Sequence, residues 1–311
     1  MNKLKKALAL ILALSMVLAV TACDNKGAET VEEGVKAKIN DMVITQKEYD
    51  EHLSVYKKMA ETQYGEGAWD MEISEGQTMG AYYESTLLDQ LIMDLLLVEA
   101  AEKEGIQMSE EDMKAEIDEF KSYLETDEEY QKFLENYGMT EEYLKESLRK
   151  EFLINHYLSI KIENLKPTDE ELQTLFEDLN MNVRVRASHI LVNTEDEAKA
   201  VIERLNKGEK FEDIAKELNK DATAATGGDL DYFEYTDMVQ PFSEASFALE
   251  IGEISEPVKT DFGYHVIKVT DKTIDSEVTL ESERSVLTEY YKSFKYEELL
   301  ENLKNDANIT I

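Results

Sequence analysis

The sequence predicts an α+β protein in which a small, mainly antiparallel sheet with helices is inserted into a mainly helical domain built from the two flanks. Three observations lead to this prediction. Helical periodicity dominates residues 39–166 and returns at 280–304. Alternating, strand-like patterns begin near residue 180. The chain has 311 residues, and single cores usually stop growing at about 250 to 300 residues.

The composition fits a folded protein with a very polar surface. Hydrophobic residues make up 42% of the chain and charged residues 32%. Only three prolines and thirteen glycines occur, which favours abundant helix. The 68 acidic and 33 basic residues give a formal charge of −35, which repels nucleic acid and anionic lipid. We therefore expect no nucleic-acid partner.

The first residues predict export. Lys3, Lys5 and Lys6 precede an apolar run at 7–20 that is too short to span a bilayer comfortably, as in a secretory signal. A buried N-terminal helix is the alternative. The run ends Val-Thr-Ala-Cys at 20–23, which resembles a bacterial lipobox, and Cys23 is the only cysteine. We expect a signal peptide at 1–22, a lipid-modified Cys23 and a polar tether over 23–36 that anchors the protein to the membrane.

Four helix starts in the flanks carry the spacing of a capping box, with a hydroxyl followed three residues later by a carboxylate. These hydroxyls belong to Thr45, Ser109, Thr126 and Thr168. Four or five helices follow over residues 39–166. The strongest spans about 81–104, where a wide apolar stripe is typical of a helix packed in a core.

After residue 180 the pattern becomes that of a compact α+β unit. A strand is predicted at 183–192, helices at 198–207, 211–218 and 238–249, and closing strands at 256–260 and 263–270. The apolar alternation at 307–311 predicts a short strand whose partner would be the strand-like segment at 37–44. We therefore predict one domain from 37–179 with 273–311, and an inserted domain at 180–272.

Two of the four histidines, His189 and His265, lie on the first and last strands of the insert. A lone strand histidine is often only a hydrogen-bonded core residue. Their context is more specific. The blocks Arg-Ala-Ser-His-Ile-Leu-Val at 186–192, Gly-Gly-Asp-Leu at 227–230, Met-Val-Gln-Pro-Phe at 238–242 and Phe-Gly-Tyr-His-Val-Ile at 262–267 occur in the order of the parvulin prolyl isomerases. With the lipobox and helical flanks, the whole chain resembles the PrsA-like foldase lipoproteins of Gram-positive bacteria.

This resemblance implies site residues. His189 and His265 match the paired active-site histidines, Thr260 the hydroxyl of their network, and Asp221 a position held by cysteine or aspartate. The apolar cup that receives the proline ring would be formed by Leu230, Phe233, Met238 and Phe242. Alternatives remain open at this point: Asp221 as a loop acid facing water, and the cup residues as ordinary core.

The implied activity is peptidyl-prolyl cis/trans isomerisation of exported, proline-containing polypeptides outside the membrane, with client binding by the helical domain. Rotation about an amide breaks no covalent bond, so no nucleophile, metal or cofactor is expected. The loop at 193–197 carries three acids and no base, which argues against phosphorylated substrates.

Two other interpretations are considered. The insert could serve only as a peptide-binding module in a non-catalytic holdase chaperone, which an isomerisation assay would reveal. The chain could instead be a solute-binding lipoprotein, although such proteins usually have two α/β lobes; a thermal-shift screen with sugars and amino acids would identify one. The sequence is compatible with a monomer and with a homodimer.

Overall fold

The computed structural model describes residues 33–74, 76–124 and 126–311. The signal segment, Cys23 and the start of the tether lie outside these residues. The chain divides into two compact units, Met1–Leu165 with Phe294–Ile311 and Lys166–Ser293. We call them the helical unit and the sheet unit, and each is described by itself.

Five α-helices precede residue 159 in the described part of the helical unit, within the number that the sequence predicts. They are α2 (Gln46–Tyr64), α3 (Met79–Lys103), α4 (Glu110–Ser122), α5 (Asp127–Tyr137) and α6 (Glu141–Leu158). Thr45 and Ser109 form the expected capping boxes, and the Thr126 hydroxyl accepts a hydrogen bond from the Glu129 N–H. Local capping chemistry therefore fixes where these helices begin.

A three-stranded sheet completes this unit, with strand order β2-β1-β9. Strand β1 (Val35–Ile39) pairs with β2 (Met42–Thr45) and with β9 (Ile309–Thr310), antiparallel in both cases. The pairing predicted for the tail is confirmed, since Ile39 lies opposite Ile309. The segment 37–44 is two strands rather than one, because Asn40 at φ 52° reverses the chain.

The core of the helical unit is formed mainly by helices α2 to α6, with contributions from β1, β2, β9 and α11 (Leu280–Asp306). Within the predicted stripe of α3, Leu87, Leu91, Leu96 and Val98 are buried. Two short elements lie between α2 and α3: the 3-10 helix η2 (Ala68–Asp70) and the hairpin of β3 (Glu72–Ser74) and β4 (Gln77–Thr78).

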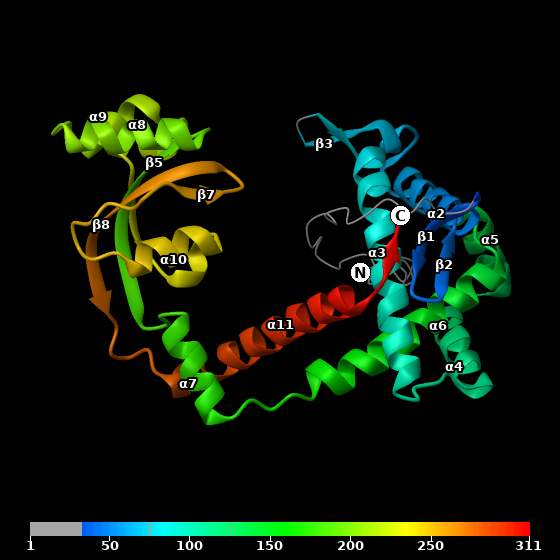
Figure 1. Ribbon diagram of the computed structural model, residues 1–311. Helices are drawn as coiled ribbons and strands as arrows, with labels where there is room; N and C mark the ends of the chain where they lie inside the picture. Colours follow the sequence, from blue (N-terminus) through cyan, green and yellow to red (C-terminus); the bar gives the residue numbers. More distant parts are fainter. Residues whose placement is uncertain (1–32, 75, 125) are drawn as a thin grey trace. The chain divides into compact units, whose positions relative to one another are not determined.

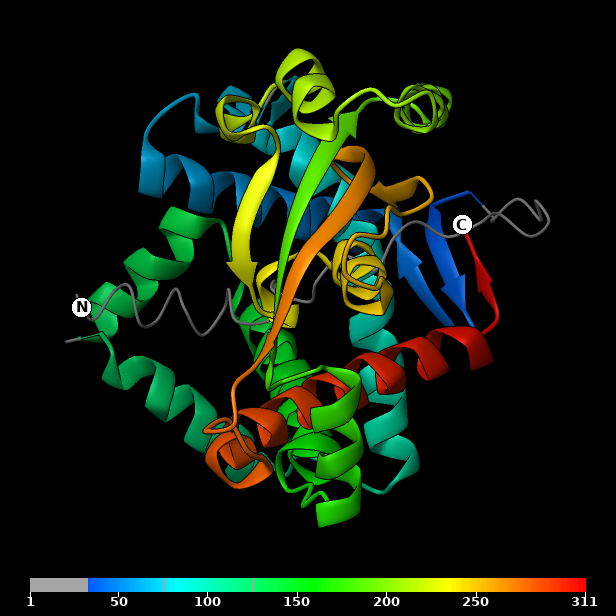
Figure 2. The same ribbon diagram turned by 90° about the vertical axis from the view of Figure 1, so that its left-hand side faces the viewer.

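The sheet unit contains an antiparallel four-stranded sheet of order β6-β5-β8-β7, in which β5 and β8 are central. Strands of this sheet lie side by side in Figure 2. The strands are β5 (Val183–Val192), β6 (Asp229–Phe233), β7 (Val258–Thr260) and β8 (Gly263–Ile274). The helices are α7 (Asp169–Asp178), α8 (Glu195–Asn206), α9 (Phe211–Leu218) and α10 (Gln240–Ala248), with short 3-10 turns η4 (Ala222–Thr226) and η5 (Tyr235–Asp237).

The two faces of this sheet have separate cores. Ile190 and Val266 pack with α8 and α9 on one face, whereas Val185 and Ile267 pack with α10 on the other (Figure 1). Because side chains alternate along a strand, the odd-numbered residues 185–189 of β5 point to the α10 face. A third cluster joins α7 to the first part of α11 through Leu172, Phe176 and Leu287.

Among the helices of the described residues, none combines the length and apolar composition needed to cross a bilayer.

Candidate active site

The two central strands bring the predicted histidines together. His189 on β5 lies opposite Ile267, and His265 on β8 lies opposite Leu191. The histidines are therefore diagonal neighbours on one face of the sheet, a separation that long or aromatic side chains bridge. Their Nδ1 atoms lie 3.1 Å apart and their rings are nearly parallel, with centroids 5.4 Å apart. Both side chains are buried.

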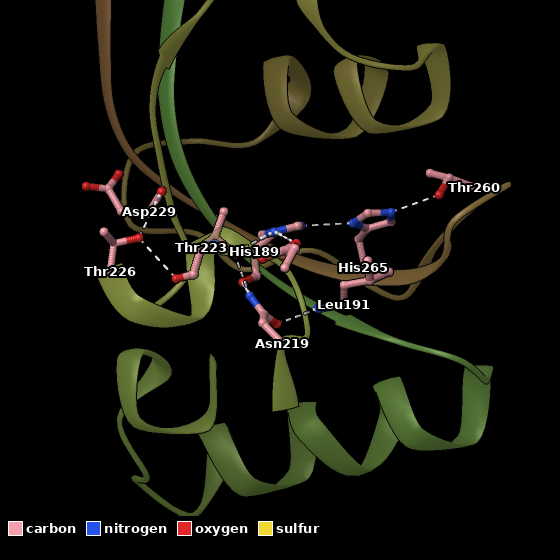
Figure 3. A network of polar contacts seen from close by, with 9 residues as sticks. His189, Leu191, Asn219, Thr223, Thr226, Asp229, Thr260 and His265 are labelled. Carbon is pink, nitrogen blue, oxygen red and sulfur yellow. Dashed lines mark hydrogen bonds and ion pairs between the residues drawn. The ribbon is translucent and has the colours of Figure 1, made fainter. Parts of the chain in front are cut away.

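A continuous chain of polar contacts runs through this pair (Figure 3). Thr260 Oγ1 lies 2.8 Å from His265 Nε2 at one end. At the other end, His189 Nε2 lies 3.1 Å from Thr223 Oγ1 and 3.3 Å from the Asp221 carboxylate. The Thr223 hydroxyl and N–H both donate to Asp221 Oδ1. All four residues predicted as catalytic thus belong to one network, whatever role each plays.

The network fixes the tautomers of the two rings. The Thr223 hydroxyl donates its proton to Asp221, so its oxygen accepts from His189 Nε2–H. In the neutral form, His189 Nδ1 is then an acceptor, and His265 donates to it through Nδ1–H. His265 Nε2 consequently accepts from the Thr260 hydroxyl, whose oxygen accepts the Phe262 N–H. Both imidazoles are satisfied while neutral.

Sequence reasoning missed Asn219 and Thr223. The Asn219 side chain accepts from Leu191 N–H and donates to the His189 carbonyl and to Thr223 Oγ1. Beyond the end of β6, the Asn219 amide thereby pairs with backbone groups of β5 as a neighbouring strand would, and it positions β5 at His189. The spacing of Asp221 and Thr223 is that of a side chain capping a turn, a signal readable in sequence. Asn219 has no comparable local signal, because the backbone groups that it contacts belong to β5.

Gly228 explains the glycine pair of the second block. Its carbonyl accepts the His189 N–H, and a Cβ built on Gly228 would lie 2.4 Å from the His189 carbonyl oxygen. Gly228 also has φ 90°. Only glycine permits this approach, which places the turn after Asp221 against the first histidine.

Burial controls the charge of the pair. Loss of hydration lowers the pKa of His265 to about 4, and the neighbouring His189 acts in the same direction. Burial also lowers the pKa of His189, although Asp221 opposes the shift. Burial tends to raise the pKa of Asp221, but hydrogen bonds from Thr223 and the adjacent His189 outweigh it and lower that pKa. The site therefore holds two neutral imidazoles beside one carboxylate at neutral pH.

The predicted cup lies against the same histidines. The Phe242 ring, near the start of α10, makes edge contacts with His265 at 5.2 Å and His189 at 6.1 Å between centroids. The Phe233 ring of β6 has its centroid 6.0 Å from that of Phe242, and both rings are buried. Leu230 and Met238 are only partly buried in this cluster and remain reachable from outside.

Within the described part of the chain, no group of three or more His, Cys, Asp or Glu side chains is placed to hold a metal ion. The residues present offer an apolar surface, neutral hydrogen-bonding rings and a single carboxylate. Such a site can bind an apolar ring and orient a peptide group in a region of low polarity.

Comparison with known proteins agrees with this architecture. Residues 171–273 match the PPIC-type PPIase domain, and residues 1–158 match the SurA-like N-terminal domain. The chain is 33% identical over 320 residues to the foldase protein PrsA of Caldanaerobacter subterraneus subsp. tengcongensis, covering 97% of this chain and 99% of that protein. It is 30% identical over 328 residues to PrsA of Clostridium tetani, covering 99% and 96%.

Among solved structures, the peptidylprolyl isomerase PrsA of Bacillus anthracis aligns with 27% identity and a TM-score of 0.43, over 70% of this chain and 95% of that chain. The alignments with these two PrsA proteins, at 33% and 30% identity, span both units of the chain. The chain therefore belongs to the PrsA foldase family and carries a PPIC-type peptidyl-prolyl isomerase domain.

Proposed function

We propose that this protein is an extracytoplasmic foldase that binds exported polypeptides and catalyses cis/trans isomerisation of their prolyl bonds at the histidine site. The observation that carries the proposal is the pair of neutral, fully hydrogen-bonded histidines packed against Phe242. That arrangement provides an apolar surface at Phe242 with the oriented imidazoles of the histidines beside it. Family membership supports the same activity.

The reaction needs little from the protein beyond binding. Rotation about the X–Pro bond has a barrier of about 18 to 20 kcal/mol and takes tens to hundreds of seconds unassisted. A cup that holds the proline ring leaves the preceding carbonyl free to turn. Removal of water from the amide weakens the resonance that a polar solvent stabilises. Binding the twisted amide better than either planar form lowers the barrier.

We assign the cup to Leu230, Met238 and Phe242, with Phe233 supporting Phe242 from behind. His189, His265, Thr260 and Asp221 then hold the polar side of the cup and set its electrostatics, without exchanging protons with the substrate. Leu230 and Met238 are the partly exposed members, so they are the ones that a proline ring can reach first.

A prolyl isomerisation assay on the full chain tests the proposal. The protein should accelerate isomerisation of a proline peptide, and Met238→Ala should lower that acceleration. Ile274→Ser is a matched control, because Ile274 is 74% exposed in the same unit and lies outside the cup. No acceleration by a folded wild-type chain that still prevents client aggregation would favour the non-catalytic holdase instead.

The start of α8, directly after β5, argues for substrates without phosphate. Acids occupy the start of α8, where Glu197 accepts from Asn193 N–H and Thr194 N–H, and Glu195 pairs with Lys199. The helix start that could have bound a phosphate is thus already filled by a carboxylate. A large gain in rate with phosphoserine before proline would refute this preference.

Membrane anchoring through a lipid on Cys23 is the proposed means of retention. It rests on the sequence at 20–23, which lies outside the described residues, and on the absence of another cysteine in the chain. Cys23→Ala should move the protein from the detergent phase to the aqueous phase after export. Unchanged partitioning of the variant would exclude the lipid anchor.

A further inference from the structure

The helical unit exposes apolar side chains in the segment from the end of α2 to the start of α3, beside its core. Tyr64 is 59% exposed, Met71 and Ile73 are 44% exposed, and Tyr82 is 43% exposed. We call these four residues, together with Trp69 and Tyr83, the aromatic knob. Side chains of this kind scattered singly on a surface are ordinary, but a group within one short segment indicates a contact surface.

The aromatic knob is held by close packing. The Trp69 and Tyr83 rings stack at 5.7 Å with 5° between their planes, and Tyr83 stacks on Tyr56 of α2 at 5.1 Å. A Cβ on Gly80 would lie 2.4 Å from Trp69 Nε1, so glycine at this position lets the indole lie flat on α3.

The exposed residues of the aromatic knob contact the same packed segment. Tyr82 meets the edge of Tyr83 at 5.7 Å, and the Met79 N–H donates to the Met71 carbonyl at 2.9 Å. Burial raises the pKa of Tyr83, and Tyr64 and Tyr82 act in the same direction. A surface ordered in advance loses little side-chain entropy when a partner binds.

The segment that carries the aromatic knob has charge of one sign. No Lys or Arg occurs in the sequence from residue 59 to residue 102. Acidic residues lie within the segment that forms the knob, and among the described residues Glu61, Glu66 and Asp70 make no ion pair within 4.0 Å. An apolar surface in a segment whose charged residues are all acidic complements a partner in which basic and apolar residues alternate.

We infer that the aromatic knob is a docking surface for unfolded polypeptide segments that carry Lys or Arg among apolar residues. The inference rests on the proposed foldase function and adds the place and chemistry of client binding outside the isomerase site. A second copy of this face would bring like charges together, and an anionic bilayer would be repelled for the same reason. A basic, apolar client satisfies both the rings and the carboxylates.

The test uses a peptide that contains no proline, so it cannot be a substrate of the histidine site. The capped peptide Lys-Phe-Lys-Leu-Lys-Val-Lys is titrated into the full chain at about 0.15 M salt, where nonspecific charge attraction is screened. Trp69 is the only tryptophan in the chain, so its emission reports contact at the knob. Saturable binding with a change in this emission is expected.

Variants separate the aromatic knob from the general acidity of the protein. Ile73→Ser with Tyr82→Ser should weaken binding about tenfold while the charge is unchanged. Asp70→Lys should weaken it similarly while the apolar surface is kept, and it serves as the second variant if the double variant fails to fold. Ile160→Ser is the control, since Ile160 is 55% exposed elsewhere in the same unit; it should bind as the wild type does.

Three outcomes would overturn the inference: equal binding of the charge-reversed peptide Glu-Phe-Glu-Leu-Glu-Val-Glu, unchanged affinity in both knob variants, or binding to phosphatidylglycerol vesicles that Ile73→Ser abolishes. Isomerisation of a proline peptide is measured in parallel. Failure of the wild-type chain to bind the peptide, with isomerisation intact, would reject the docking surface alone, whereas absence of isomerisation in the wild-type chain would reject the proposed function.

Discussion

Each imidazole of the histidine pair uses both of its ring nitrogens within the protein, leaving neither free to receive a proton from a substrate. An acid–base role would require one of these contacts to break. A proline ring can contact the apolar residues Leu230 and Met238 without displacing any hydrogen-bond partner of the histidines. We therefore expect the shape of the cup, rather than proton transfer, to determine the rate.

We predict that Met238→Ala and Phe242→Ala each lower kcat/KM by about tenfold or more, because truncation removes contacts with the ring in a packed cluster. Phe242 is 3% exposed, so its variant should also lose stability, whereas the partly buried Met238 should lose less. Isomerisation rates and urea unfolding of the full chain check both. Near-wild-type rates in both variants, with a large solvent isotope effect, would point to proton transfer instead.

The pH dependence follows from the lowered pKa values of both histidines. Above pH 6.5 the pair is neutral in the folded and unfolded chains, so it contributes no pH dependence. Between pH 6.5 and about 4 the unfolded chain binds protons that folded His265 does not, so stability should fall as the pH drops. Unfolding midpoints of wild type and His265→Gln, compared across this range, isolate the effect. A fall equally steep in the variant would contradict it.

Thr223 is predicted to position His189, because its oxygen accepts from Nε2 while its proton goes to Asp221. Thr223→Val should lower the rate and disturb the His189 tautomer seen by nitrogen-15 NMR, and Thr223→Ser should restore both. Thr226→Val, in the same turn but outside the histidine contacts, is the control. An unchanged histidine spectrum in Thr223→Val would exclude this role.

Sequence patterns predicted His189, Asp221, Thr260 and His265, and the structure places all four in one network. Asn219 could not be predicted, because it acts on backbone groups of a strand distant in sequence. Asp231 was also unforeseen. It adopts φ 59° within β6, a conformation that aspartate tolerates but that favours glycine.

At the scale of elements, capping boxes predicted helix starts well because they depend on residues three apart. Strand β6 was missed, since its sequence Asp-Leu-Asp-Tyr-Phe is short and contains acids. Its pairing with β5 is stabilised by tertiary contacts such as the Arg186–Asp229 ion pair and the burial of Phe233. Propensity alone carries little of that information.

Helix α3 carries a carboxylate in the core that the isomerase chemistry does not use. Burial raises the pKa of Asp94 to about 7, with Lys150 opposing the shift. A folded-state pKa above the unfolded value means that this group costs stability as the pH rises from about 4 through 7.

Asp94→Asn should therefore stabilise the helical unit at pH 8, by on the order of 2 kcal/mol, and have little effect near pH 4. Urea unfolding followed by Trp69 emission measures the helical unit. Asp89→Asn on the same helix is the control. A variant less stable than wild type at pH 8 would show that the carboxylate makes contacts worth more than the burial of its charge.

At the scale of the whole molecule, the predicted insertion depended on helical patterns that return after the strands. The proposed boundaries at 180 and 272 lie inside the compact unit Lys166–Ser293. The cores on both faces of the four-stranded sheet fall within 180–272, but the cluster of α7 with α11 falls outside. Its dependence on contacts between distant helices kept it from being predicted.

We predict that residues 180–272 fold alone but unfold at lower urea than residues 166–293. The shorter fragment loses the pairing of Val183 with Ile274 and the packing of Tyr235 against α7 and its neighbours. Circular dichroism and urea unfolding of both fragments check this. An unfolded 180–272 beside a folded 166–293 would mean that α7 and the start of α11 belong to the isomerase domain.

The pairing of β9 with β1 has a consequence for the order in which the protein matures. Strand β9 follows all of residues 166–293, whereas β1 precedes them. A chain that crosses a membrane from its N-terminal end delivers the whole sheet unit before Ile309 can reach Ile39. The sheet unit can thus be complete while β1 of the helical unit still has an unpaired edge. The pairing of β9 with β1 joins residues very distant in sequence, so it forms late. During export, the sheet unit would then fold before the helical unit is completed.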